Sequence, residues 1–428
     1  MALRVRHDVL LTVLLFGLAV AAQSFQWLAP LEAQVQLACQ WLRPAPDSFS
    51  SYPAPAVAAA AATLLLMLAM IALALLVERA AWRRAGAVLA LAGFAAILAW
   101  SYVRFGLVLP LSPALAAGLL SFAAIEDRAW RKRRERRRRI VRLLAPHLPA
   151  GRIDEVGRKE WRADLGCESR EMTVLFCGPR DFASLSEGLA PRDLATLVPT
   201  FLGPMTRLVH AHRGTLDRYQ GATLVAFWGA PTADPQHAEN AVRAALAMAR
   251  GVGELSDGCI ARGWPPLKIG IGIHTGVMSV GDLGSDFRPA YAAMGQAVDL
   301  GARLEILAKR HGVAIVISQS TLTQVPGLIA REVDLVRLRG KMQPLSLFEP
   351  LGFVGEVDAP ALARLARYHH ALALYRAGHF AESGAVFRPL ADEDADCPLH
   401  RLYLRRIAHY LAEPPPAGWD GVWSIRGK

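Results

Sequence analysis

The most constraining feature of this sequence is a set of long apolar runs without a single charged side chain. Each run is long enough to cross the hydrocarbon core of a bilayer as a helix, which takes roughly 17–25 residues. A re-entrant hairpin is an alternative for the last two runs, because a single arginine separates them and prolines interrupt the later one. We therefore predict a membrane region over residues 1–127 with about four transmembrane helices, at residues 9–31, 56–77, 85–103 and 105–125.

Arginines beside these runs predict the side of the membrane on which each end lies. Arg4 and Arg6 precede the first run, three arginines lie between the second and third, and a dense basic stretch follows the fourth. By the positive-inside rule both ends are then cytoplasmic. We expect a multi-pass protein of the inner (plasma) membrane with a large cytoplasmic part. Residues 4–21 also fit a cleavable signal peptide, which would leave the orientation of the later runs unchanged.

The basic stretch RAWRKRRERRRR, residues 128–139, opens a helical linker that we place at residues 128–168. Residues 1–142 hold 17 Lys and Arg against 7 Asp and Glu, whereas the remainder holds 31 against 30. A polybasic segment beside a membrane attracts anionic headgroups, and it also suits a stop-transfer anchor. Because no basic surface or interleaved aromatic residues follow, we expect membrane lipid as a partner and no nucleic acid.

Beyond the linker, the sequence alternates between short strand patterns and longer helical ones. Gly221 and Ala222 separate two β-rich runs and predict the turn of a hairpin. We expect the apolar strand after the second helix to turn at Gly276. Within this strand we interpret His274 as a hydrogen-bonded core histidine and not as a ligand. This order of elements predicts an α+β sandwich, with strands at 171–177, 216–220, 223–229 and 267–281 and helices at 193–212 and 236–252.

Five motif segments follow one another in this region: HRGTLDRYQGATLVAFWGAP, DPQHAENAVRAALAM, LKIGIGIHTGVMSVGDLGS, YAAMGQAVDLGARLE and VRLRGKMQPLSLFEPLG. In this unbroken order they resemble the class III adenylyl/guanylyl cyclase domain. The resemblance implies a ferredoxin-like α+β cyclase-homology domain over residues 169–352. The predicted spans also resemble the membrane part of bacterial cyclases with a CHASE2-type sensor, although about 25 residues fill the loop where that sensor is expected.

The resemblance also implies which residues should hold catalytic metal. Such cyclases use two metal ions, bound by two aspartates, to activate the 3′-hydroxyl and neutralise the triphosphate. The aspartate of a pattern like FxDIRGFT corresponds to Gly178, and that of a pattern like DKYIGDAIMAFW corresponds to Ala222. Neither side chain can bind metal, so we expect no cofactor, and Mg or Mn only if the domain is active. We interpret Asp181 as a helix N-cap, with metal rescue as the alternative, and Asp217 is not a replacement.

Other family positions are altered less. The resemblance assigns the transition-state arginine to Arg303 and the ribose-orienting asparagine to Asp299, which would repel a triphosphate. The base-recognising lysine corresponds to Arg218 and its partner to Ala292, and the phosphate-binding lysine corresponds to Arg339. Each arginine could instead be a solvated surface residue.

These substitutions predict a cyclase-homology signalling protein that is catalytically impaired or inactive. One alternative is the non-metal half of a heterodimeric cyclase, because such domains form their clefts between two subunits. Another is an active adenylate cyclase with unusual ligands that makes cAMP from ATP. The expected partners are a second cyclase domain, in a homodimer or heterodimer, and ATP or GTP.

The C-terminal residues 356–428 predict a separate helical tail. The spacing of Gly378, Phe380, Ser383 and Phe387 resembles one tetratricopeptide helix pair, and a third helix precedes three consecutive prolines. One such repeat cannot bury its own apolar face. We therefore expect it to pack on the cyclase-like domain or on a partner, with Trp419 or Trp423 tucked against it.

Overall fold

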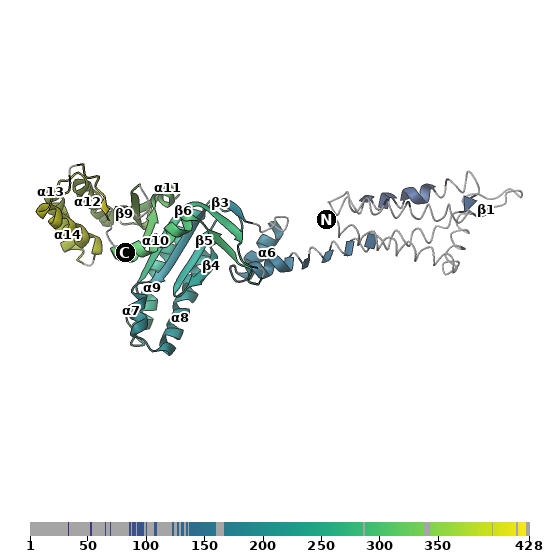
Figure 1. The fold of residues 1–428 in the computed structure, drawn as a ribbon, viewed down its shortest axis with the longest axis horizontal. Coiled ribbons are helices and arrows are strands. Elements are labelled where there is room, and N and C mark those ends of the chain that lie inside the picture. The colour runs from purple at the N-terminus through teal and green to yellow at the C-terminus, as the bar shows by residue number, and fades with distance from the viewer. Residues whose placement is uncertain are drawn as a thin grey trace. The chain divides into compact units, whose positions relative to one another are not determined.

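The computed structural model describes residues 137–159, 167–285, 287–337, 343–395, 397–416 and 418–424, together with isolated positions before residue 137. The chain divides into two compact units, residues 1–136 and 137–428. Figure 1 shows the ribbon of both units with their elements labelled.

The described part of the first unit contradicts one part of the predicted fold class, the α-helical transmembrane region. Most residues of the four predicted spans lie outside the described residues. Among the residues described here are two short strands, β1 (Tyr52–Pro53) and β2 (Leu107–Val108), which pair in parallel. None of the helices in the described part of the chain is long and apolar enough to cross a membrane. This finding contradicts the predicted transmembrane region, because a spanning segment needs a continuous apolar helix of about 20 residues.

The second unit is built on one mixed sheet of nine strands. Its order is β11-β9-β10-β8-β6-β3-β5-β4, and β7 pairs with β6 beside this path. The central strands β3 and β6 are antiparallel along their whole lengths, whereas β6 and β8 are parallel. The strands are β3 (Glu168–Pro179), β4 (Thr215–Gln220), β5 (Thr223–Trp228), β6 (Ile269–Asp282), β7 (Tyr291–Met294), β8 (Ile315–Ser318), β9 (Leu328–Arg337), β10 (Leu345–Phe353) and β11 (Trp423–Ser424).

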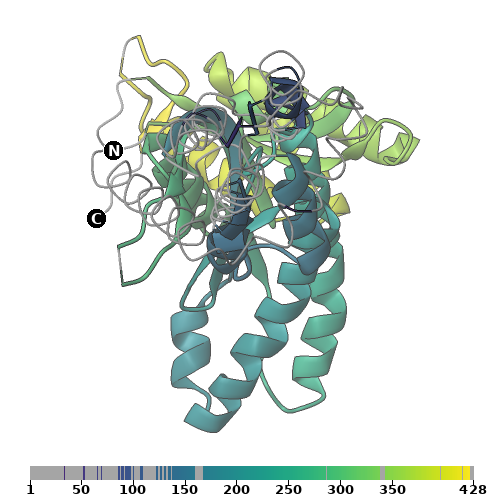
Figure 2. The ribbon, with the colours of Figure 1, turned by 90° about the vertical axis from the view of Figure 1, so that its right-hand side faces the viewer.

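Alternating apolar residues of β3 face two different cores, which is why this strand lies at the middle of a layered domain. Leu175 and Cys177 pack beneath the helices α8 (Pro191–Ala211) and α9 (His237–Ile260). The short helix α7 (Phe182–Glu187) lies between β3 and α8 in the chain. Figure 2 shows α8 and α9 side by side, extending beyond the sheet. The α+β sandwich predicted from the sequence is confirmed.

The opposite face of the sheet is covered by the linker and by α10 (Gln296–His311). The linker, with helix α6 (Ala150–Lys159), buries six apolar residues against this face. Two polar contacts fix it to the start of β4: His147 Nδ1 lies 2.7 Å from the Leu216 carbonyl, and an Arg152 guanidinium nitrogen donates to the Gly214 carbonyl at 3.3 Å. The buried linker residues are Ile140, Leu143, Leu144, Leu148, Ile153 and Val156.

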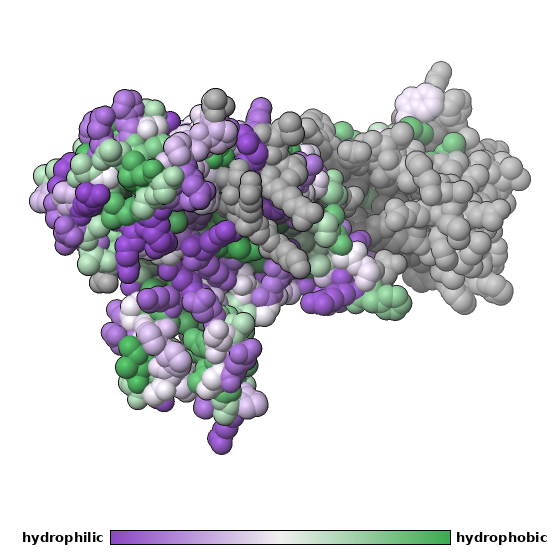
Figure 3. All heavy atoms as spheres, turned by 60° about the vertical axis from the view of Figure 1, so that its left-hand side comes forward, coloured by the Kyte–Doolittle hydropathy of each residue, from purple (hydrophilic) through white to green (hydrophobic). Residues whose placement is uncertain are grey.

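The C-terminal tail packs on α10 and β9 of its own chain, which is one of the two predicted arrangements. Its helices are α12 (Ala359–Arg376), α13 (Phe380–Glu393) and α14 (Pro398–Ala412). Tyr368, Leu372 and Tyr403 share one core with Leu307 of α10 and Val333 of β9. The short helix α11 (Gln319–Thr323) precedes β9. In the view of Figure 3, the surface of this unit mixes hydrophilic and hydrophobic areas.

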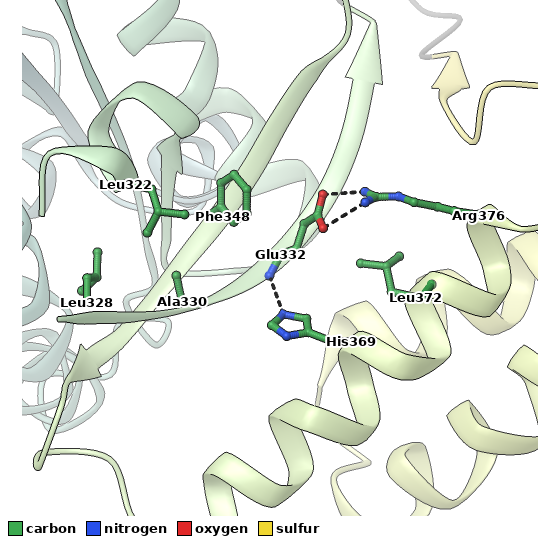
Figure 4. A pocket seen from close by; sticks show the side chains of 9 residues that line it. Leu322, Leu328, Ala330, Glu332, Phe348, His369, Leu372 and Arg376 are labelled. Carbon is green, nitrogen blue, oxygen red and sulfur yellow. Dashed lines mark hydrogen bonds and ion pairs between the residues drawn. The ribbon is translucent and has the colours of Figure 1, made fainter. Parts of the chain in front are cut away.

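A small cavity of about 280 Å³ marks the joint between α12 and the sheet (Figure 4). Leu322, Phe348 and Leu372 contribute apolar walls. Two guanidinium nitrogens of Arg376 donate to the carboxylate of Glu332 at 2.6 and 2.9 Å. This double contact ties the end of α12 to β9, so the tail is fixed by charge as well as by apolar packing.

One predicted turn is wrong. Gly276 lies within β6, where it pairs with Met172, and the ladder continues without a break to Val280. A β-carbon at Gly276 would lie 3.2 Å from that of Ala297 on α10. The glycine therefore permits close packing of helix on sheet and makes no turn.

Candidate active site

The two positions at which the resemblance predicts metal-binding aspartates lie at neighbouring strand ends. Gly178 is near the end of β3, and Ala222 lies at the tip of the β4–β5 hairpin beside Gly221. Gly221 has a φ of 60°, which explains why a glycine begins this turn. The predicted hairpin turn is therefore confirmed. The fold brings both positions together while neither supplies a carboxylate.

Three side chains occupy the space around Gly178. A β-carbon there would lie 2.5 Å from Thr223 Oγ1, 2.8 Å from Glu305 Oε1 and 3.3 Å from Lys309 Nζ. Glu305 and Lys309 form an ion pair one helical turn apart on α10, with the carboxylate side chain 7% exposed. Burial raises the pKa of Glu305, although the hydrogen bond and the charge of Lys309 oppose this. The place of the expected aspartate is thus filled by other side chains.

These residues do not fit a two-metal site. The nearest carboxylate, Glu305, is already neutralised by Lys309, and the ammonium group would repel a divalent cation. Across the described residues, no group of three or more His, Cys, Asp and Glu side chains is arranged to hold a metal ion. No metal-dependent step can be derived from this geometry.

The predicted residues of α10 are presented on one exposed side of the helix. Asp299 and Arg303 are one turn apart and both exposed. Asp299 lies in the first turn, where the helix dipole favours a negative charge. Gly272 of β6 allows this helix to approach the sheet, because a β-carbon there would overlap the backbone of Glu305. The fold therefore fixes α10 while leaving Arg303 accessible to solvent.

The two residues of the predicted base-recognition pair lie on different strands, β4 and β7. Arg218 lies on β4 and is half-exposed, and its guanidinium donates to the carboxylate of its neighbour Asp217. Ala292 lies half-buried on β7, opposite Gly281 of β6. The predicted phosphate-binding residue Arg339 lies outside the described residues.

Two further predictions concern single residues. Asp181 occupies the N-cap position of α7 with a left-handed backbone (φ 49°), but its side chain makes no capping hydrogen bond in the described structure. Asp181 therefore lies at the predicted N-cap position, but its side chain does not cap the helix. His274, interpreted as a hydrogen-bonded core histidine, is half-buried, and its Nδ1 lies 2.8 Å from Ser318 Oγ.

Replacing Asp217 with asparagine is expected to stabilise the protein at neutral pH. Burial raises the pKa of Asp217 to about 6, and the charge of Arg218 opposes this only in part. Because the folded carboxyl ionises at higher pH than the unfolded one, ionisation destabilises the fold as pH rises from about 4 to above 6. Asp217→Asn should gain about 2 kcal/mol at pH 8 and little near pH 4. Urea unfolding at both pH values measures this, and an equal gain at both would contradict it.

Comparison with known proteins finds a match for the central region of the chain. The family described as the adenylate and guanylate cyclase catalytic domain matches residues 167–348. This region is a cyclase-homology domain. The match begins just before β3 and ends within β10, so it leaves out α6, α12, α13, α14 and β11. The resemblance predicted from the five motif segments is confirmed for the catalytic domain.

Curated relatives match part of this chain and part of their own length. Adenylate cyclase 1 of Rhizobium meliloti is 32% identical over 203 residues, which cover 47% of this chain and 30% of that protein. The adenylate cyclase of Anabaena cylindrica is 28% identical over 195 residues, covering 44% and 38%. The crystal structure of the guanylyl cyclase Cya2 is 30% identical and covers 44% of this chain and 95% of its own, with a TM-score of 0.41. The chain spans about a third of the length of these curated relatives.

The three residues that fill the altered site of the cyclase-homology domain were not predicted from the sequence. Thr223 directly follows Ala222, where the pattern GDA has alanine, and this difference was a readable signal. The spacing of Glu305 and Lys309 predicts an ion pair on a helix. Their approach to Gly178 depends on how α10 packs on the sheet, which local spacing does not reveal.

Proposed function

We propose that this cyclase-homology domain is catalytically inactive as a homodimer and serves as a signalling domain. The observation that carries the proposal is the filled position at Gly178, where Thr223, Glu305 and Lys309 replace a metal-binding carboxylate. Without two carboxylates, neither ion would be held against the triphosphate. Phosphoryl chemistry would then lose its principal charge stabilisation.

Pairing of two such domains is part of this proposal. Large apolar side chains are exposed on β6, on β7 and on α10: Val277 is 65% exposed, Met294 54% and Ile306 60%. Val277 and Met294 belong to the paired strands β6 and β7. Clusters of exposed apolar residues commonly mark protein interfaces. A second cyclase domain would cover them.

A second candidate function is the non-metal half of a mixed cyclase dimer. The exposure of Arg303 on α10 favours this candidate. A guanidinium presented from one subunit could stabilise developing phosphate charge in a cleft whose metals are bound by the other subunit. Asp299, one turn away, would weaken that contact by repelling the phosphates.

Assay of the unmodified chain with ATP or GTP and manganese tests the inactive homodimer. We expect no cyclic nucleotide above the level without protein, and no change on Arg303→Ala. Robust product that Arg303→Ala abolishes would contradict the proposal and favour an active cyclase with unusual ligands.

The second candidate function is tested by mixing two forms of this chain, without any other protein. One copy would carry Gly178→Asp, Ala222→Asp, Thr223→Ala and Arg303→Ala, and the other would be unmodified. If the unmodified copy supplies its arginine in trans, the mixture should exceed either protein alone. The matched control replaces the second copy with its Arg303→Ala variant, and equal product in both mixtures would reject this function.

A further inference from the structure

A short segment near the chain end crosses the helical tail and the outer edge of the sheet. We call residues 418–424 the strap. The indole ring of Trp419 lies against one aromatic ring from each of the three tail helices. The centroid distances are 5.5 Å to Tyr375, 5.7 Å to Phe380 and 5.0 Å to Tyr410. These three rings and the neighbouring edge of β9 form what we call the tail groove.

A second tryptophan follows four residues later. Trp423 lies 5.6 Å from Tyr410, measured between ring centroids, and the guanidinium carbon of Arg406 lies 4.6 Å from the Trp423 centroid. Val422, between the two, is 4% exposed. The strap thus places two aromatic anchors and one aliphatic residue on the helices and sheet beneath it. Aromatic anchors of this kind dominate peptide binding.

The strap is also held by its backbone and by charge. β11 pairs in parallel with β9, with Trp423 opposite Val336 and Ser424 opposite Arg337. A guanidinium nitrogen of Arg337 lies 2.6 Å from Asp420 Oδ2. The strap therefore adds a strand to the edge of a sheet, a mode that also serves for recognition of extended peptides. If the strap left, this edge of β9 would be open to another strand.

Several features allow the strap to be exchanged. Both tryptophans are half-buried, and the side chains of Arg337 and Asp420 are 42% and 47% exposed. Three consecutive prolines, Pro414, Pro415 and Pro416, separate the strap from α14 and favour an extended spacer. The same segment of another copy would make identical contacts, since exchange of identical elements creates no new interface.

We propose that the tail groove is an exchangeable docking site for an extended segment with two tryptophans four residues apart and an acidic residue after the first. A second copy of this chain supplies that segment in trans. The groove recognises the aromatic pair through Tyr375, Phe380 and Tyr410, and the acidic residue through Arg337. This contact is separate from the pairing of cyclase-homology domains and would link tails between copies.

A labelled peptide with the sequence of residues 414–424 tests the groove. In the intact chain the tethered strap competes at a high effective concentration, so the peptide should bind weakly. In the full chain with Trp419→Ala and Trp423→Ala, the groove is vacated. Fluorescence anisotropy should then show at least tenfold tighter peptide binding. Equal affinity for both chains, or equal binding of a peptide with both tryptophans changed to alanine, would overturn the proposal.

A charge exchange tests the acidic contact and guards against a misfolded variant. Asp420→Lys in the full chain leaves both tryptophans in place and should open the groove to the peptide in part. In the vacated chain, Arg337→Glu should weaken peptide binding several-fold. A peptide with lysine in place of Asp420 should recover that loss. Failure of this recovery would remove Arg337 from the recognition site.

Binding between two whole chains tests whether the strap of one copy occupies the tail groove of another. The donor carries Arg337→Glu, which weakens its own groove, and keeps its strap. The acceptor carries Trp419→Ala and Trp423→Ala. Recovery of donor by tagged acceptor should exceed recovery of acceptor by tagged acceptor, because pairing through the cyclase-homology domains is the same in both mixtures. Equal recovery at all concentrations would reject the second copy as the occupant.

Discussion

The Gly178→Asp variant is expected to lose about 3 kcal/mol of unfolding free energy and to bind no manganese. Its new β-carbon would lie 2.5 Å from Thr223 Oγ1 and 2.8 Å from Glu305 Oε1, so neighbouring atoms must move. Overpacking of this kind costs about 1–3 kcal/mol. The added carboxylate would also face the buried Glu305, and like charges in a buried place repel strongly.

Relief of the crowding should reverse this loss. Thr223→Ala removes the nearest atom, and Ala222→Asp supplies the second carboxylate expected from the family pattern. We expect the triple variant with Gly178→Asp to recover most of the stability and to bind manganese, measured by denaturant unfolding and by calorimetric titration. Gly178→Ala separates the steric part from the charge. Gly253→Asp, at an exposed helical glycine with no atom within 4 Å of a β-carbon, is the surface control.

Restored metal ligands alone should yield at most a trace of cyclic nucleotide. Asp299 would still repel the phosphates, and Ala292 would still leave the base without a partner. We expect a gain of more than about 1,000-fold, equivalent to about 4 kcal/mol, when Asp299→Asn and Ala292→Asp or Ala292→Thr are added. Arg303→Ala should then abolish product. Stable, metal-binding Gly178→Asp without Thr223→Ala would show that the filled position is not the obstacle.

The Arg406→Met variant is expected to lose about 3–5 kcal/mol, the second large effect. Arg406 of α14 donates to Asp334 of β9 at 2.8 and 3.0 Å, and these side chains are 6% and 4% exposed. His311 Nε2, at the end of α10, lies 2.8 Å from the same carboxylate. Removing one partner of a buried ion pair leaves a charge without compensation. Thermal and urea unfolding of the full chain measure the loss.

Two comparisons make this result specific. Arg367→Met breaks an exposed pair with Glu393, whose side chains are 44% and 41% exposed, and should change stability by less than about 1 kcal/mol. Arg406→Met combined with Asp334→Leu should recover part of the loss, since no charge is then left buried. A loss of equal size in the exposed and buried variants would show that the network does not hold the tail to α10.

The same network predicts sensitivity to acid. Burial alone would raise the pKa of Asp334, but hydrogen bonds from His311 and Arg406 outweigh burial and lower the pKa. The resulting stabilisation is complete above the unfolded pKa of about 4 and is lost as pH falls through the lower folded value. Between pH 5 and 3 the unmodified chain should therefore lose more stability than the Asp334→Asn variant.

Structural features set by neighbouring residues could be predicted from the sequence, whereas contacts between residues far apart in the chain could not. The hairpin at Gly221 and the helices near α8 and α9 were predictable because turn chemistry and apolar spacing act over a few residues. Gly276 was misread because a glycine has the same local signature in a turn and under a packed helix. The membrane spans were predicted from composition, and the described helices do not bear them out.

The sequence by itself determined the cyclase-homology domain, because its five motif segments and the missing carboxylates at Gly178 and Ala222 can be read from residue identity and order. Tertiary structure decided what fills the altered site, which face the linker covers and where the strap lies. Glu305 reaches Gly178, and Arg406 reaches Asp334, across elements far apart in the chain. Such contacts depend on the packing of helix on sheet, and packing is set by the whole core.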